Sequence, residues 1–359
     1  MSYQRPHIAA MNGYTPGEQP SADNVVKLNT NENPYPPPPP VLKALQAVTA
    51  DQLRRYPDPL AKRFRQVAAN MHGLTPDHII AVNGGDELLR LVITTFVEPG
   101  KPIGMAEPSY SLYPVLAEIH GSPMVRVPLD DEWRLPADYA EKLNDAGVQL
   151  AFIVNPHAPS GRLTGVNALK EIAQNFQGVL VIDEAYVNFV DPDLKHDATE
   201  LVRRCANVIL LRSMSKGYSL AGLRFGYGVG DPSLIEPMLT KTKDSYNVDA
   251  VAQQVATAAL ESRGEAAITW QDVRRERARL SQELSLLGLE VAPSQSNFVL
   301  AGATDEMNTT AKKLYQALKK RDIFVRYFDQ PRLKDKLRIT VGTPKENDAL
   351  LAALRELIA

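Results

Sequence analysis

Four short runs, each apolar from end to end, most constrain how this chain can fold. They are residues 79–82, 150–154, 179–182 and 208–211. A strand with one face in water alternates apolar and polar residues, whereas a strand covered by helices on both faces does not. A helical pattern at residues 87–96 follows the first run. We therefore predict that residues 41–245 form an α/β domain around a mainly parallel sheet.

The start of this domain and the residues after it have different patterns. Residues 41–56 repeat apolar side chains near a period of 3.6 and predict one amphipathic helix. After residue 245, helical patterns at 272–288, 311–321 and 347–359 mix with strand patterns at 289–301, 323–328 and 336–342. We predict a smaller α+β domain over residues 246–359.

Residues 1–40 contain a run of five prolines, Pro36 to Pro40, which favours an extended arm. A disordered tail is the alternative. The segment LNTNENPY at residues 28–35 mixes apolar residues with turn-forming polar groups. We therefore expect the arm to be ordered against the body of the protein.

Charge and composition exclude several classes of partner. The net charge of −2 over 359 residues gives no basic excess for nucleic acid. No apolar run reaches the ~20 residues that a membrane helix needs. The single cysteine, Cys205, cannot form an intramolecular disulfide, and the first 20 residues lack the apolar core of a signal peptide. We expect a cytoplasmic protein that binds neither membrane nor nucleic acid, and the histidines show no metal-site spacing.

Polar residues follow each apolar run. They are Gly84 to Asp86, Asn155, Asp183 with Tyr186, and Ser213 to Lys216. Ligands of open α/β sheets bind beyond the carboxyl ends of the strands, so these residues predict a site there. The alternative is that strand ends are polar only because loops are wet.

Lys216 does not fit that alternative. It lies among small and apolar residues, and Arg224 follows eight positions later. Burial and a nearby cation lower the pKa of a lysine and leave its amine nucleophilic near neutral pH. An arginine supplies a permanent charge for a phosphate.

The segment SMSKGYSLAGLRFG, residues 213–226, resembles the cofactor-lysine signature of fold-type I pyridoxal-phosphate (PLP) aminotransferases. NPHAPSG at 155–161, VIDEAY at 181–186 and NGGDELL at 83–89 resemble further segments of that family in the same order. NENPYPPPP at 31–39, SNFVL at 296–300 and LRITVGTP at 337–344 match as well. The resemblance implies the family's fold, with a large parallel-sheet domain, a smaller C-terminal domain and an N-terminal arm, and PLP as cofactor.

The resemblance also implies a role for each residue near the cofactor ring. Lys216 would hold PLP as a Schiff base and, once freed, would move the proton between the substrate Cα and the cofactor. Asp183 would face the ring nitrogen, although it could instead cap a helix. Asn155 and Tyr186 would donate hydrogen bonds to the ring oxygen. Tyr110 would stack on the ring, and a buried core tyrosine is the competing interpretation.

For the cofactor phosphate, the resemblance implies the backbone N–H groups of Gly85, Asp86 and Glu87 at a helix start. The side chains implied beside them are those of Ser213, Ser215 and Arg224. Tyr56, in RRYPDP, resembles the residue that reaches the phosphate of a partner subunit. The family resemblance therefore implies a homodimer with shared active sites.

Within this superfamily, YTPGEQP at 14–20, RRYPDP at 54–59 and the lysine segment look most like the histidinol-phosphate aminotransferases. That resemblance implies small-molecule substrates, histidinol phosphate and 2-oxoglutarate, which are both anions. Arg326 and Arg338 are the candidates to bind them, although Arg326 could equally be a surface charge. Tyr14 and Asn297 are further substrate candidates.

One segment departs from the family pattern. His157, Ala158 and Ser160 stand where the family usually has Asn, Asn and Thr, which could alter the surroundings of the ring. Three other functions remain open: an aromatic amino-acid aminotransferase, a PLP-dependent lyase such as a threonine-phosphate decarboxylase, and a regulator without catalysis. Lys216, Asp183 and Arg224 together argue against the regulator, which needs no imine.

Overall fold

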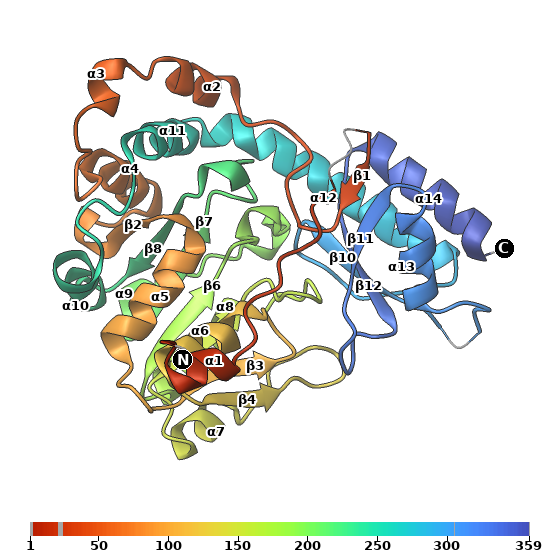
Figure 1. Cartoon of the computed structure of the whole chain (residues 1–359), viewed down its shortest axis with the longest axis horizontal. Helices are drawn as coiled ribbons and strands as arrows, with labels where there is room; N and C mark the ends of the chain where they lie inside the picture. The colour runs from red at the N-terminus through yellow and green to blue at the C-terminus, as the bar shows by residue number, and fades with distance from the viewer. Residues whose placement is uncertain (1–2, 21–23, 305, 359) are drawn as a thin grey trace.

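The computed structural model describes residues 3–20, 24–304 and 306–358. Figure 1 shows a larger α/β unit and a smaller unit, joined by the long helix α12 (Arg263–Leu286), with the N-terminal segment running between them. The predicted fold class is confirmed. The domain boundaries at residues 40 and 245 stay predictions.

A seven-stranded sheet forms the centre of the larger unit, in the order β2-β8-β7-β6-β5-β3-β4. Strands β3 to β7 are parallel, and β8 is antiparallel to both of its neighbours. The bounds are β2 Ile79–Val82, β3 Ile103–Glu107, β4 Met124–Pro128, β5 Leu150–Val154, β6 Val179–Asp183, β7 Val208–Ser213 and β8 Gly226–Gly230. The mainly parallel sheet was therefore predicted correctly.

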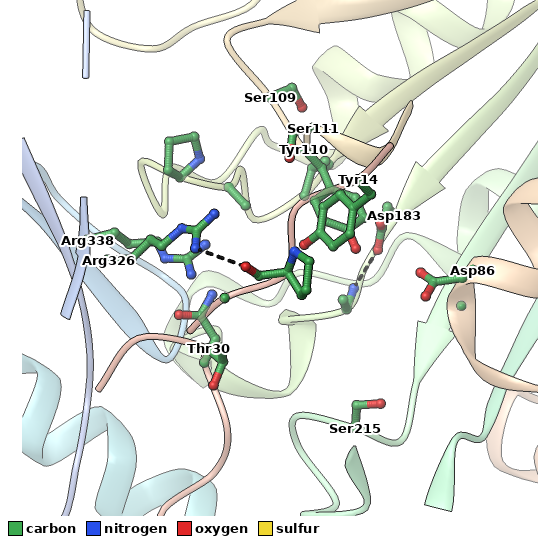
Figure 2. A pocket seen from close by; sticks show the side chains of 18 of the residues that line it. Tyr14, Thr30, Asp86, Ser109, Tyr110, Ser111, Asp183, Ser215, Arg326 and Arg338 are labelled. Atoms are coloured by element: carbon green, nitrogen blue, oxygen red, sulfur yellow. Dashed lines mark hydrogen bonds between the residues drawn. The ribbon is translucent and has the colours of Figure 1, made fainter. Parts of the chain in front are cut away.

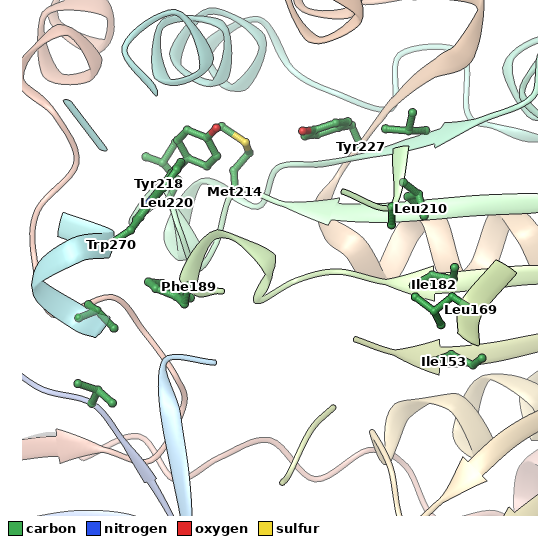
Figure 3. Packing of buried hydrophobic residues seen from close by; sticks show 14 of the residues in the cluster. Ile153, Leu169, Ile182, Phe189, Leu210, Met214, Tyr218, Leu220, Tyr227 and Trp270 are labelled. Carbon is green, nitrogen blue, oxygen red and sulfur yellow. The ribbon is translucent and has the colours of Figure 1, made fainter. Parts of the chain in front are cut away.

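Both faces of this sheet are buried, as the unbroken apolar runs predicted. On β6, Leu180 and Ile182 belong to one core cluster while Val181 belongs to another on the opposite face. Figure 3 shows the first cluster continuing from Ile182 toward Trp270 of α12. Each buried aliphatic side chain contributes ~1.5–3 kcal/mol, so the two layers fix the strand ends firmly.

Helices cover both faces of the sheet. They are α4 Lys62–His72, α5 Gly84–Phe96, α6 Leu112–His120, α7 Tyr139–Asp145, α8 Val166–Asn175, α9 Thr199–Arg204 and α10 Pro232–Pro237. Shorter 3₁₀ turns lie at Pro76–His78, Val187–Phe189, Pro192–Leu194 and Ala221–Leu223, and a π turn lies at Met238–Thr242. No helix in the described part of the chain has an apolar stretch long enough to cross a membrane.

The strand pattern missed β3, β4 and β8. Strand β8 reads GYGVG, which resembles a loop. Its glycines are required by close packing: a Cβ on Gly228 would lie 2.9 Å from Ile80 Cγ2. Glycine is needed in this strand because neighbouring side chains occupy the space that a Cβ would take. The local sequence does not reveal that packing.

The arm is ordered over its described residues, 3–20 and 24–40, as expected. It contains a short helix α1 (Pro6–Ala10) and a strand β1 (Val26–Leu28), which pairs in parallel with β11 of the smaller unit. The arm thus contributes an edge strand to the C-terminal sheet, and the segment before β1 passes over the larger unit (Figure 1).

The single helix predicted over residues 41–56 was wrong. The segment forms α2 (Pro39–Gln46) and α3 (Ala50–Leu53). Thr49 starts the second helix with a capping box, in which its side chain accepts from the Gln52 N–H and the Gln52 side chain accepts from the Thr49 N–H. Leu42, Leu45 and Leu53, three of the apolar residues that gave this segment its helical period, are 47%, 49% and 64% exposed in this chain.

The smaller unit contains a five-stranded sheet, in the order β1-β11-β12-β10-β9, and the helices α12, α13 and α14. Its other strands are β9 Glu290–Val291, β10 Phe298–Gly302, β11 Ile323–Tyr327 and β12 Lys336–Thr340. Helices α13 (Ala311–Lys319) and α14 (Pro344–Ile358) follow the predicted pattern, and α12 begins at Arg263, earlier than predicted. Helix α11 (Ala250–Glu261) packs against α2 and α4.

Candidate active site

A cavity of about 490 Å³ opens at the carboxyl ends of the parallel strands, where the larger unit, the smaller unit and the arm meet. In Figure 2, Arg326 and Arg338 lie at one end and Asp86 and Ser215 toward the other. Tyr14, Tyr110 and Asp183 lie between them. The candidate residues that line the cavity are Lys216, Asp183, Tyr186, Gly85, Asp86, Tyr110, Ser213, Ser215, Arg224, Tyr14, Arg326 and Arg338.

Lys216 reaches the cavity from the loop after β7. Its Nζ donates a hydrogen bond of 2.8 Å to the backbone oxygen of Thr30 in the arm. Burial and, after it, the positive charge of Arg338 lower the pKa of Lys216 to about 8. A substantial fraction of the amine is therefore neutral near physiological pH and can act as a nucleophile.

Asp183 is the last residue of β6 and is buried. Its carboxylate accepts from the Tyr113 hydroxyl at 2.9 Å and from the Ala185 N–H at 3.1 Å. Burial raises the pKa of Asp183 to about 6, against the lowering effect of these hydrogen bonds. No salt bridge within the described residues supplies a cation for it. A buried carboxylate of this kind suits the protonated nitrogen of a pyridine ring.

Tyr186 and Tyr110 line the same cavity, but Asn155 does not. The Tyr186 hydroxyl accepts from Asn31 Nδ2 at 3.1 Å, and the Tyr110 ring meets the Tyr14 ring edge-on at 5.9 Å between centroids. The amide of Asn155 is fully buried and bonded to the backbone N–H and C=O of Thr164, at 2.7 and 3.1 Å.

The start of α5 and the loop after β7 form a cup at the other end. Arg224 lies 3.5 Å from the carboxylate of Asp86 and donates to Ser215 Oγ at 3.4 Å. A Cβ on Gly84 would come within 2.7 Å of the Arg224 guanidinium. Helix N–H groups, hydroxyls and a guanidinium together suit a phosphate. Glu87 lies outside the cavity lining and accepts from the Asn83 N–H and from Asn247.

Arg326 and Arg338 lie opposite each other on β11 and β12. Both guanidiniums lie near the Phe328 ring, with Cζ–centroid distances of 5.2 Å for Arg326 and 5.5 Å for Arg338. Arg338 donates to the Asn29 carbonyl at 2.8 Å. The fourth substrate candidate, Asn297, is buried behind this surface, donates to the Asn31 carbonyl at 2.9 Å, and does not line the cavity.

Tyr56 lies away from the cavity of its own chain. It is 81% exposed and stacks on Tyr246 at 4.4 Å between ring centroids. Tyr56 therefore does not reach the cavity of its own chain, and its side chain is exposed at the surface.

Sequence analysis missed two residues that hold the site together. Thr30 accepts from Lys216, and Tyr113 donates to Asp183. Thr30 lies in the 28–35 segment already singled out, and Tyr113 follows the candidate Tyr110 by three residues, a spacing that could have indicated it. Ser109, Ser111 and Gln330 also line the cavity.

Comparison with known proteins agrees with this geometry. Residues 23–354 match the family described as aminotransferase class I and II. The chain is 43% identical to histidinol-phosphate aminotransferase 1 of Trichormus variabilis, over 99% of each chain. It is 41% identical to the histidinol-phosphate aminotransferase of Synechocystis, over 98% of this chain and 97% of the other.

Among solved structures, the histidinol-phosphate aminotransferase of Sinorhizobium meliloti in complex with pyridoxal-5'-phosphate superimposes with a TM-score of 0.90. The two proteins are 26% identical, and the match covers 100% of this chain and 98% of the other. A family match over nearly the whole sequence, relatives of the same length and the arrangement of Lys216, Asp183 and Arg224 lead to one conclusion: the chain belongs to the class I and II aminotransferases.

Proposed function

We propose that this protein transfers an amino group between L-histidinol phosphate and 2-oxoglutarate, a step of histidine biosynthesis, with PLP as cofactor. The observation that carries the proposal is one cavity holding an amine of lowered pKa, a buried acid, a phosphate cup and two arginines. The names of the full-length relatives support the choice of substrate.

When bound, PLP supplies an aldehyde that condenses with amines and a ring that accepts electrons from the substrate Cα. Lys216 would attach to it and, after substrate displaces the lysine, would take the proton from Cα. The Thr30 carbonyl gives the freed Nζ a place to rest inside the cavity. A pKa of about 8 keeps that amine close to the working pH, which favours proton transfer in both directions.

Asp183 would hold the ring nitrogen in its protonated form. The Tyr113 hydroxyl fixes one carboxylate oxygen and the Ala185 N–H fixes the other, so the carboxylate is oriented before any ligand arrives. Tyr186 would donate to the ring oxygen, and Tyr110 would cover the ring. Asn155 already donates one amide proton to the Thr164 carbonyl, so only its second N–H would be available for the ring oxygen.

The anionic groups of the two substrates would bind to Arg338 and Arg326 in turn. A guanidinium offers paired N–H donors that suit both phosphate and carboxylate. Arg338 is the stronger candidate because it is more deeply placed and its Nε is buried without a hydrogen-bond partner in the described part of the chain.

Replacing Arg338 with alanine should raise KM for both anionic substrates about 10–100-fold, because a hydrogen bond to a charged group contributes ~1.5–3 kcal/mol. Initial-rate kinetics with histidinol phosphate and 2-oxoglutarate measure this. Arg355, an exposed residue of α14 that pairs with Glu283, serves as the matched control. Unchanged KM values would place anion binding elsewhere.

We further infer a homodimer whose active sites are shared. Leu42, Leu45, Leu53, Tyr56 and Tyr246 are exposed, and they lie on the segments around α2, α3 and the π turn. Burying this apolar surface in a second copy would explain why an amphipathic pattern faces outward here. Tyr56 would then approach the phosphate of the partner's cofactor.

Tyr56→Phe should weaken PLP binding about tenfold while leaving the dimer intact, since a hydrogen bond to a charged group is lost but the ring remains. Spectroscopic PLP titration and sedimentation measure the two properties. Leu45→Glu should instead lower the dimer fraction. Full PLP affinity in a monomeric protein would contradict shared sites.

One assay separates this function from its rivals. The protein is incubated with 2-oxoglutarate and either histidinol phosphate or phenylalanine, and glutamate and carbon dioxide are measured. The proposal predicts glutamate chiefly from histidinol phosphate. A preference for phenylalanine would indicate an aromatic aminotransferase, and carbon dioxide release from a phosphorylated amino acid such as threonine phosphate would indicate a lyase.

A further inference from the structure

The loop between β11 and β12 makes a specific contact with the larger unit. Arg332 in this loop donates to the carbonyl of Leu129 at 2.6 Å and to that of Asp130 at 2.5 Å. Its Cζ lies 4.7 Å from the centre of the Trp133 ring. Figure 1 shows this loop beside the one that follows β4. A single guanidinium thus makes three contacts across the two units.

The receiving turn is built to present those carbonyls. The Asp130 carboxylate accepts from the N–H groups of Glu132 and Arg134 at 2.9 and 2.8 Å, and the Leu129 N–H donates to the Glu107 carbonyl at 3.0 Å. Trp133 has a φ of +64° and Arg332 one of +66°. Two non-glycine residues in left-handed backbone cost free energy, which the contacts around them offset.

The same loop supplies one wall of the active-site cavity. Phe328, Gln330 and Leu333 line the cavity, and the Leu333 N–H donates to the Gln330 carbonyl at 3.1 Å. Phe328 lies against both Arg326 and Arg338. This loop therefore packs against both arginines as well as lining the cavity.

On its other side, Trp133 faces His157, with ring centroids 6.1 Å apart and an angle of 30°. His157 is buried and makes contacts of 2.9 Å to the Pro108 carbonyl and 2.8 Å to Ser160 Oγ. A carbonyl only accepts, so the His157 Nε2 bears the proton and Nδ1 accepts from Ser160. Burial lowers the pKa of His157 to about 4, which keeps the ring neutral.

This contact explains two of the departures in the NPHAPSG segment. His157 and Ser160 fasten the 155–161 loop to Pro108, two residues before Tyr110. Arg332 is thus connected through Trp133 and His157 to the loop that carries a ring-covering residue.

We propose that Arg332 is a positioning residue, which latches the β11–β12 loop onto the turn at residues 129–134 and so holds the cavity wall around the two substrate-binding arginines. This inference rests on the proposed function for its kinetic consequence. Loss of the latch frees the wall and weakens binding of anionic substrates, whereas the cofactor cup at the opposite end of the cavity is unaffected.

The test compares Arg332→Ala and Arg332→Lys with the wild type in the PLP-loaded protein. Hydrogen–deuterium exchange of residues 328–335 should become at least fivefold faster in Arg332→Ala. KM for histidinol phosphate should rise about tenfold with kcat changed less than threefold and the visible absorbance of the bound cofactor unchanged. Lysine keeps the charge and has three donors, but it lacks the planar group that donates to two carbonyls while it stacks on an indole, so it should recover less than half of the effect.

Arg321→Ala is the matched control, because Arg321 is an exposed arginine of the same unit that pairs with Glu356 at 3.4 Å. It should change neither exchange nor KM. Unchanged exchange in Arg332→Ala, or an unchanged KM, overturns the proposal. If exchange is faster in Arg332→Ala but the wild-type protein does not use histidinol phosphate, the positioning role of Arg332 is supported and the proposed substrate is wrong. Failure of this inference and failure of the proposed function can therefore be told apart.

Discussion

Lys216→Ala is expected to lower kcat at least 10³–10⁴-fold, the largest effect of any single substitution in this chain. Proton transfer by a positioned base contributes ~10²–10⁴-fold, and the alanine variant also loses the nucleophile that presents the cofactor to the substrate. A neighbouring side chain would have to attach the cofactor and also move the proton at Cα to replace Lys216. Steady-state assays of glutamate formation measure the loss.

The folded state should tolerate this change. Among the residues that the structure describes, Lys216 Nζ makes one hydrogen bond, to the Thr30 carbonyl, and removing a buried amine of lowered pKa relieves a desolvation penalty. The melting temperature of the cofactor-free variant should therefore equal or exceed that of the wild type. Lys142→Ala, which removes an exposed lysine paired with Asp138, is the control and should retain full activity. A Lys216→Ala protein with more than a tenth of the wild-type rate would refute the role.

The second large effect is expected for Asp183→Asn, which should lower kcat about 10²–10³-fold. Removing one partner of a buried ion pair costs ~3–5 kcal/mol, and each 1.4 kcal/mol is about tenfold in rate. Asparagine keeps the shape, and its one oxygen can still accept from the Tyr113 hydroxyl, but its NH₂ group cannot accept from the Ala185 N–H, so the defect combines the lost charge with one lost hydrogen bond. Retained activity would mean that the ring nitrogen does not need this carboxylate.

Asp183→Asn should increase the stability of the cofactor-free protein, although it lowers kcat. The pKa of Asp183 is about 6 when folded, above its ordinary value of 3.8, so the folded state binds the proton more tightly. Its contribution to stability is present below pH ~4 and is lost as the pH rises through about 6. The stability gain of Asp183→Asn over wild type should thus grow from pH 4.5 to 7.5, by up to about 2–3 kcal/mol. A difference that does not change with pH would contradict the raised pKa.

The positions of the two central candidate residues, Lys216 and Asp183, could be predicted from the sequence because they depend on topology. A run that is apolar throughout becomes a strand of a covered parallel sheet, and the residue that ends the run then lies at the ligand-binding edge. Asp183 ends β6 and Lys216 lies three residues beyond the end of β7, so both reach one cavity. Their chemical roles came from the family resemblance.

Side-chain direction was much harder to predict. Asn155 follows β5 as expected, yet its amide is bonded to the backbone of Thr164, nine residues further along. Asn297, a candidate for substrate binding, instead donates to the Asn31 carbonyl of the arm. Each of these polar groups found a backbone partner that depends on the tertiary structure, and strand or helix patterns carry no information on such competition.

Residues 41–56 show a second limit of sequence-based prediction. An apolar period of 3.6 predicted one helix over residues 41–56, but the Thr49–Gln52 capping box divides it in two. The exposed leucines of this segment show a limit of the amphipathic pattern. It identifies the apolar face of a helix but not the surface that this face packs against.

The identity of the lysine that carries PLP is the most direct test of the whole account. The PLP-loaded protein is reduced with borohydride and digested, and the modified peptide is located by mass spectrometry. The account predicts that the cofactor is attached to Lys216 and that the Lys216→Ala protein is not labelled. Attachment to any other lysine, such as Lys27 near the same arm segment, would contradict it.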